Sequence, residues 1–410
     1  MLPPFNLKSQ CLITMIFFAG FNLHAQNNPN NEEPIFSFKN GLGITSADSS
    51  FAINIRFRIQ SRFLMNTQSA SDFSPRNWEA RVRRARLSFA GYVYNPKLSY
   101  YLQLSFSRGD LDWNDLDNSV QNTSPNIVRD AMIFYRPNEH FQFGFGQGKL
   151  PGNRQRVVSS GSLQFYDRSP VNGTFTPDRD FGFFTTYVNS ISNQFIYLLK
   201  GSITSGEGRN SVASNTGLAY TGRVELLPFG EFSLNGDYFE GDIAREPTPK
   251  LSIAAGGHFN DLAIRTRGQT GQDLYQARSF STFIADFLFK YNGWALSSEY
   301  LKRQAVHSPI TINSSGDIRD LTVGDGTNTQ LSYCFPSSME IAARYSIVTP
   351  DKKIQERMKQ VSEIGIGITK YLMKHKTKAQ FNVFYHEDKN VATATKTDFF
   401  FFVFQIEAGI

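Results

Sequence analysis

Five arginines on two neighbouring segments are the side chains of this chain best suited to binding small anions. A guanidinium stays ionised and offers a planar fork of donors that suits carboxylate and phosphate. Residues two apart on a strand share a face about 6.5–7 Å apart, and adjacent strands lie about 4.8 Å apart. We therefore expect the five to share one basic patch. They are Arg56, Arg58 and Arg62 on the first segment and Arg84 and Arg86 on the next.

Two readings of this patch stay open. In one, the arginines form a ladder that conducts anions. In the other, inward carboxylates neutralise the wall and leave only a mild anion preference. The candidate neutralising residues are Asp130, Glu225, Asp286, Glu299 and Glu340.

A second basic cluster lies in the long polar stretch 148–180. Its length indicates a loop that folds into a pore and narrows it, with a solvated external loop as the alternative. Its basic residues are Lys149, Arg154, Arg156, Arg168 and Arg179, against Asp167, Asp178 and Asp180.

The elements that carry these side chains have a period of two. From 51 to 65 apolar residues such as Phe57 and Ile59 alternate with polar residues such as Arg58. Strict alternation predicts a β-strand with one apolar and one polar face. A soluble sandwich would turn the apolar face inward, whereas a transmembrane barrel would turn it toward lipid.

The number and spacing of such segments favour the barrel. Sixteen are expected, counting 231–239 as a strand and leaving 251–259 inside a long loop at 240–279. Short turns alternate with long polar loops, as in bacterial outer-membrane barrels with short periplasmic turns and long external loops. The sequence predicts an all-β fold, a transmembrane antiparallel barrel of about 16 strands (14–18). Its predicted location is the bacterial outer membrane.

Composition and the N-terminus agree with an exported barrel. The 410 residues include 38 Phe and 17 Tyr but are only 19% charged. Disordered chains are poor in aromatics, and helical membrane proteins need apolar runs of about 20 residues. Residues 1–25 are predicted to be a signal peptide, 26–50 a polar periplasmic segment, and 51–410 one barrel domain.

Several short motifs resemble the phosphate-selective porin O and P family. The resemblance covers about 51–190. Its motifs are Arg83-Arg84-Ala85-Arg86-Leu87 with Gly91 and the turn Asn95-Pro96-Lys97, Arg129-Asp130-Ala131, Tyr135-Arg136-Pro137, Gly146-Gln147-Gly148-Lys149-Leu150-Pro151, Ser159-Ser160, Arg168-Ser169-Pro170 and Arg179-Asp180-Phe181-Gly182. The resemblance implies a 16-stranded, usually trimeric porin with a basic lumen. By matched motif it assigns Arg84 and Arg86 to the ladder and Lys149 to the constriction.

Other chemistries lack support in the sequence. It has no HExxH, GxSxG or paired-cysteine metal spacing, so no catalytic residue, metal site or cofactor is predicted. The arginines alternate with lipid-facing residues, which argues against nucleic-acid binding. The predicted function is passive diffusion of small anions, phosphate suspected, through a homotrimer embedded in outer-membrane lipid. The alternatives are a general weakly selective porin, a closed structural or adhesive barrel, and an outer-membrane enzyme.

Overall fold

The computed structural model describes residues 34–38, 41–107, 127–192, 194–212 and 215–410. The predicted signal peptide, 1–25, lies outside the described residues.

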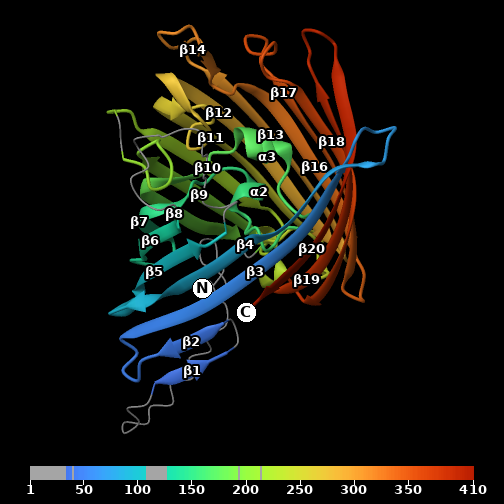
Figure 1. Ribbon diagram of the computed structural model, residues 1–410. Coiled ribbons are helices and arrows are strands. Elements are labelled where there is room, and N and C mark those ends of the chain that lie inside the picture. Colours follow the sequence, from blue (N-terminus) through green and yellow to red (C-terminus); the bar gives the residue numbers. More distant parts are fainter. Residues whose placement is uncertain (1–33, 39–40, 108–126, 193, 213–214) are drawn as a thin grey trace.

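Sixteen antiparallel strands form a closed barrel (Figure 1), which confirms the predicted fold class. The last strand, β20, pairs with the first barrel strand, β3, placing Phe404 opposite Phe63. The strands are β3 (Phe51–Thr67), β4 (Pro75–Val93), β5 (Asn95–Ser105), β6 (Val128–Tyr135), β7 (Phe141–Lys149), β8 (Arg179–Ser192), β9 (Phe195–Thr204), β10 (Ala219–Leu227), β11 (Lys250–Arg265), β12 (Asp273–Tyr291), β13 (Trp294–Ala305), β16 (Gly324–Cys334), β17 (Met339–Pro350), β18 (Gln360–Met373), β19 (Thr377–Lys389) and β20 (Lys396–Gly409).

Side chains alternate between an exposed apolar outer face and a buried polar inner face. On β17, Ile341 and Tyr345 are 49% and 48% exposed, whereas Arg344 and Ser346 are buried. This pattern is the reverse of a soluble core, and it suits a barrel whose outer face meets lipid and whose inner face is polar.

One predicted strand is wrong. Residues 231–239 do not form a strand, because Ser233–Tyr238 form a 3-10 turn, η2, in which Leu234 and Asn235 have positive φ angles. The barrel strand is instead β11, which contains the stretch 251–259 that was expected to be loop. Small residues such as Gly256 and Gly257 weakened its alternation. The number of barrel strands is still sixteen, because β11 takes the place of the strand expected at 231–239.

This exchange changes two connections. Residues 228–249, expected to begin with a tight turn at 228–230, form a long connection at the end where short turns join the strands. Residues 266–272, expected to belong to a loop spanning 240–279, form a short connection at the opposite, long-loop end.

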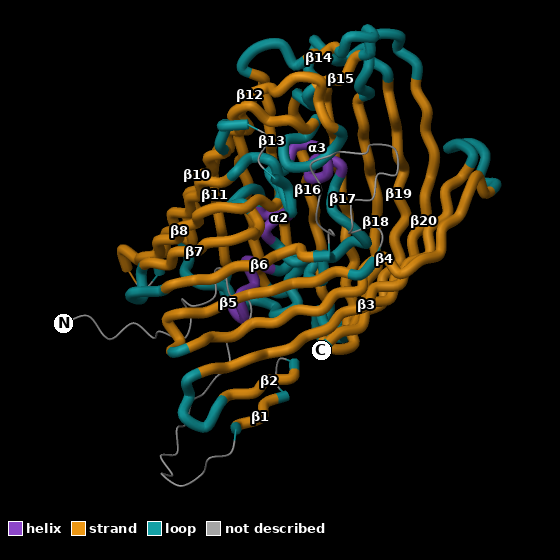
Figure 2. The backbone as a smooth tube through the Cα atoms, turned by 60° about the vertical axis from the view of Figure 1, so that its left-hand side comes forward, coloured by secondary structure: helices purple, strands orange, loops and turns teal. Residues whose placement is uncertain are grey.

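The connection between β7 and β8, residues 150–178, is named here the inner loop. It carries the short helices α2 (Arg154–Val157) and α3 (Pro170–Phe175), which lie inside the barrel (Figure 2). Its Phe175 packs in a buried cluster with Ile284 and Leu301 of the wall. The loop is therefore held partly by apolar burial, not by charge alone.

Small additions lie at both ends of the barrel. β1 (Ile35–Ser37) and β2 (Leu42–Thr45) form a hairpin, and β2 pairs with the part of β3 that lies beyond the end of β20 (Figure 1). β14 (Ile310–Ile312) pairs with β15 (Ile318–Asp320) in a loop at the other end. Among the described residues, helices of the length and apolarity needed to cross a bilayer do not occur.

Candidate functional site

A β-bulge shapes the arginine-rich wall. Arg84 pairs with Gln60 and Val82 with Ser61, so Arg83 is the extra residue on β4. A bulge breaks strict alternation and re-aims a side chain. Here Arg83 and Arg84 both reach the carboxylate of Asp167 in the inner loop, although adjacent strand residues normally point to opposite faces.

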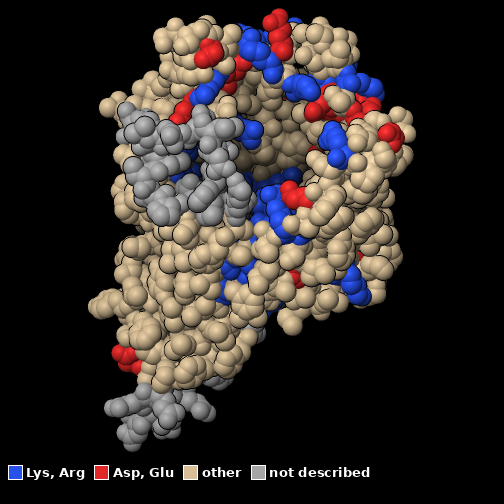
Figure 3. Space-filling model, viewed as in Figure 1, with Lys and Arg blue, Asp and Glu red and all other residues tan. Residues whose placement is uncertain are grey.

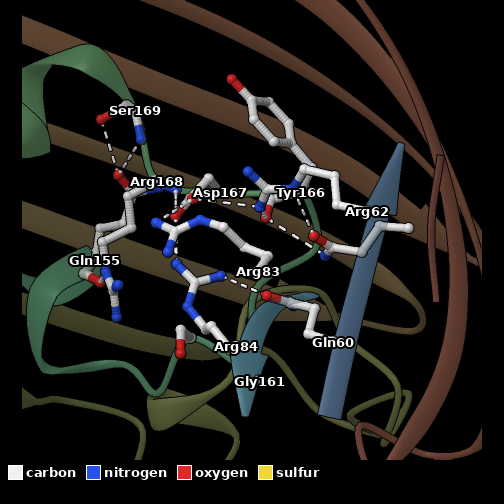
Figure 4. A network of polar contacts seen from close by, with 12 residues as sticks. Gln60, Arg62, Arg83, Arg84, Gln155, Gly161, Tyr166, Asp167, Arg168 and Ser169 are labelled. Atoms are coloured by element: carbon white, nitrogen blue, oxygen red, sulfur yellow. Dashed lines mark hydrogen bonds and ion pairs between the residues drawn. The ribbon is translucent and has the colours of Figure 1, made fainter. Parts of the chain in front are cut away.

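Three guanidiniums converge on Asp167 (Figure 4). Its carboxylate lies 2.8 Å from Arg84 Nη2, 3.1 Å from Arg83 Nη2 and 3.3 Å from Arg62 Nη2. Burial opposes the ionised carboxylate, but Arg84, Arg83 and Arg62 outweigh burial and hold the pKa of Asp167 well below its usual range. Arg62 and Arg84 of the predicted arginine patch, together with Arg83, therefore bind the inner loop.

The other three arginines of the patch line a cavity, and two of them also contact the inner loop. Arg58 Nη2 and Arg86 Nη1 donate to the Ser160 hydroxyl at 2.7 and 2.9 Å. Arg58 also lies 3.4 Å from Glu407. The third arginine that lines the cavity is Arg56.

The cavity has a volume of about 550 Å³. Among the described residues that line it, eleven are basic and two, Asp130 and Glu407, are acidic. The basic ones are Arg56, Arg58, Arg86, Arg129, Lys149, Arg168, Arg179, Lys200, Lys290, Lys374 and Lys376. In the space-filling view the lumen opens as a hollow whose rim carries both basic and acidic side chains, with lysine and arginine side chains also within it (Figure 3). The excess of basic residues in the cavity lining attracts anions.

The opposite wall is acidic and holds the inner loop. Arg154 lies 2.6 Å from Glu225 and 3.2 Å from Asp286, and it also donates to the Asp237 carbonyl at 2.7 Å. Arg223 of β10 shares both carboxylates, at 3.3 Å from Glu225 and 2.6 Å from Asp286. Arg154 is thus buried against this wall, away from the cavity.

The other four candidates of the stretch 148–180 fall into two groups. Lys149 lines the cavity and donates to the Val157 carbonyl at 2.9 Å. Arg168 also lines it, donating to the carbonyls of Gln155 and Val158. The remaining two are bound to carboxylates: Arg156 pairs with Asp178, and Arg179, at the start of β8, binds Asp130 at 2.8 Å and also lines the cavity.

A second segment enters the lumen from the short-turn end. This inner segment, residues 228–249, meets the inner loop through Glu240. The Glu240 carboxylate accepts from Gln155 Nε2 at 3.1 Å and from the Gln164 backbone N–H at 2.9 Å. Lys290 Nζ donates to the carbonyls of Gly236 and Phe239 and holds the inner segment to β12. The cavity lies among the arginine wall, the inner loop and the inner segment.

A closed antiparallel barrel with an apolar outer face and a polar interior is the arrangement of outer-membrane barrels, porins among them. The family model described as phosphate-selective porin O and P matches residues 53–315. The chain belongs to the phosphate-selective porin O and P family. It is an outer-membrane porin, and its family and fold are those of a channel, not of an enzyme.

Solved porins share its architecture at low identity. A loop-deletion mutant of the outer-membrane protein OmpT of Vibrio cholerae is 10% identical, with a TM-score of 0.55 over 88% of this chain and 100% of that one. The channel DcaP of Acinetobacter baumannii is 9% identical, with a TM-score of 0.53 over 89% and 99%. An anion-selective porin from Comamonas acidovorans is 11% identical, with a TM-score of 0.51 over 88% and 100%. No curated protein sequence matches this porin significantly.

Some residues around this porin's lumen were absent from the sequence prediction. Arg83 was missed because strict alternation places it outward, and a bulge has no distinct sequence signal. Arg129 and Lys200 were missed because each is the single basic residue of its strand, and Lys290 was missed because it lies far from Arg278, the other basic residue of β12. Only the pairing of β6, β9 and β12 with their neighbours brings these three to one cavity.

Proposed function

We propose that this porin passes small anions through the basic cavity, with phosphate as the leading solute. The observation that carries the proposal is the lining of the cavity, where basic residues far outnumber acidic ones. A concentrated positive potential raises the local concentration of anions. Conduction also requires weak, repeated binding, which many separate cations provide better than one deep site.

The attachment of the inner loop to both the acidic wall and the arginine wall supports a narrowed pathway. Arg154 holds the loop to the acidic wall, while Arg58 and Arg86 hold Ser160 from the arginine wall. A loop fixed at both sides narrows the lumen without needing to move. We propose that 148–180 is the constriction and that Arg56, Arg58, Arg86, Lys149 and Arg168 are the predicted residues that meet the anion. With Asp167 in place, Arg62 and Arg84 position the inner loop, as do Arg154, Arg156 and Arg179 through their own carboxylate partners.

The test is the reversal potential of the purified porin in a planar bilayer under a KCl gradient. We expect a reversal potential displaced toward the equilibrium potential of chloride. We also expect millimolar phosphate to block the chloride current. Chloride selectivity without phosphate block would leave a general anion-preferring porin. Cation selectivity would contradict the proposal. A protein that is folded but does not conduct would indicate a closed structural barrel.

We further propose that the porin is a homotrimer. The family resemblance implies trimers, and one of the similar solved structures is a trimer form of OmpT from Vibrio cholerae. Light scattering of the detergent-solubilised porin, corrected for bound detergent, should give three times the mass of one chain. A mass of one chain would contradict the trimer and leave the anion proposal standing.

A further inference from the structure

We propose that Asp167 is a built-in counter-anion. Its carboxylate fills an oxyanion-binding site made by Arg62, Arg83 and Arg84, and a transported oxyanion, a carboxylate or a phosphate, enters the site by displacing it. This inference rests on the proposed passage of anions. It adds a binding site next to the cavity and a residue that tunes how tightly the anion is held.

The contacts of Asp167 are those that an oxyanion ligand would receive. Oδ1 accepts from Arg84 Nη2 at 2.8 Å, and Oδ2 accepts from Arg83 Nη2 at 3.1 Å and Arg62 Nη2 at 3.3 Å. Forked guanidiniums recognise carboxylate and phosphate oxygens in the same way. The three donors come from β3 and β4, so the wall presents the site and the inner loop fills it (Figure 4).

Positive charge is concentrated at this site. Arg62, Arg83 and Arg84 all contact the single negative charge of Asp167. Arg168, the next residue, adds a further positive charge close by. A phosphate with up to two negative charges would be attracted to these guanidiniums more strongly than the singly charged side chain that it replaces.

The inner loop stays attached when the carboxylate leaves. The backbone around Asp167 has its own contacts with the wall: the carbonyl of Asp167 accepts from Arg344 Nη1 at 2.9 Å, and the carbonyl of Tyr166 accepts from Arg62 Nη2 at 2.7 Å. The Tyr166 N–H donates to Asn382 at 2.9 Å, and Phe165 is buried against the wall. The Asp167 side chain can therefore rotate away while the backbone remains in place.

The site is also accessible. The side chain of Asp167 is 20% exposed and that of Arg83 is 16% exposed, whereas Arg62 and Arg84 are almost fully buried. An incoming anion would first meet Arg83, the residue that the bulge directs inward. Arg62 and Arg84 then form the fixed base of the site.

The experiment measures how inorganic phosphate blocks the chloride current of single channels. It compares wild type with Asp167→Asn, which keeps the shape of the side chain and removes its charge. We expect half-maximal block at a phosphate concentration lower by about tenfold, the effect of removing one competing charge from a partly buried site. Asp320→Asn is the matched control, because this carboxylate pairs with Arg357 outside the cavity and should leave the block unchanged.

A second variant adds a rescue test. In Asp167→Ala the site is empty, so acetate should bind there and restore the wild-type sensitivity to phosphate. Acetate at the same concentration should have a smaller effect on the wild-type channel, where it must first displace Asp167. Equal effects of acetate on both proteins would contradict the proposal.

Failure of this inference can be told apart from failure of the proposed function. If wild type is anion-selective but Asp167→Asn weakens the phosphate block or leaves it unchanged, Asp167 only positions the loop. If wild type is cation-selective, the proposed function has failed as well.

Discussion

Individual arginines have different roles even though the sequence places them on the same wall. Arg84 is almost fully buried and bound to Asp167 and Gln60, whereas Arg58 and Arg86 face the cavity around Ser160. Substituting Arg84 would disturb the inner loop as well as the charge. Arg58 and Arg86 contact the loop at the neutral Ser160 hydroxyl, so they are the better pair for testing the charge of the cavity.

The double substitution Arg58→Gln with Arg86→Gln should lower the anion-to-cation permeability ratio severalfold, because two positive charges leave the cavity lining. The measurement is the reversal potential under a KCl gradient. Arg357→Gln, which removes an arginine from an ion pair outside the cavity, is the control and should leave the ratio unchanged. An unchanged ratio in the double variant would mean that anions take a different route through the barrel.

At the scale of elements, the inner loop and the inner segment reach the lumen from opposite ends of the barrel. They meet at Glu240, and Arg154 joins both of them to the acidic wall. We expect the inner loop and the inner segment to keep this arrangement, because separating them from the acidic wall would leave buried charges unpaired.

Arg154→Met should loosen the inner loop. We expect a larger and noisier single-channel conductance and a lower thermal midpoint, since losing one partner of a buried ion pair costs about 3–5 kcal/mol. Remaining contacts of Glu225 and Asp286 with Arg223 should keep the barrel folded. Arg357→Met, at an exposed ion pair, should cost about 1 kcal/mol or less. If the conductance of Arg154→Met equals that of wild type, the inner loop does not narrow the pathway.

At the scale of the whole molecule, stability depends on closure of the barrel. Pairing of β20 with β3 leaves neither strand with an unpaired edge along the pairing from Arg58 to Asn66. An open edge inside a bilayer exposes backbone groups that lipid cannot satisfy. The β1–β2 hairpin adds to β3 only beyond this region, at Ala52–Ile55.

Deletion of residues 396–410 should therefore abolish folding, whereas deletion of residues 34–50 should leave a folded barrel. The measurement is the shift in gel mobility between unheated and boiled samples, which a folded barrel shows and an unfolded chain does not. A heat-modifiable product from the C-terminal deletion would show that closure by β20 is dispensable. Loss of the shift in the N-terminal deletion would show that the hairpin is needed for assembly.

Sequence alone was sufficient to predict the barrel and its arginine wall. The period of two decides which residues face the lumen, so Arg56, Arg58, Arg62, Arg84 and Arg86 could be placed on one wall before any contact was known. Where small residues weaken the alternation, as at Gly256 and Gly257, the same reasoning chose the wrong strand.

Only the tertiary structure decided what each of those arginines contacts. Asp167 lies more than 80 residues from Arg83 and Arg84 along the chain, and their meeting depends on the path of the inner loop and on the bulge in β4. The same holds for Arg129, Lys200 and Lys290, which strand pairing and closure bring to one cavity. Periodicity is a local property of the chain, whereas the choice of partner across the lumen depends on closure of the whole barrel.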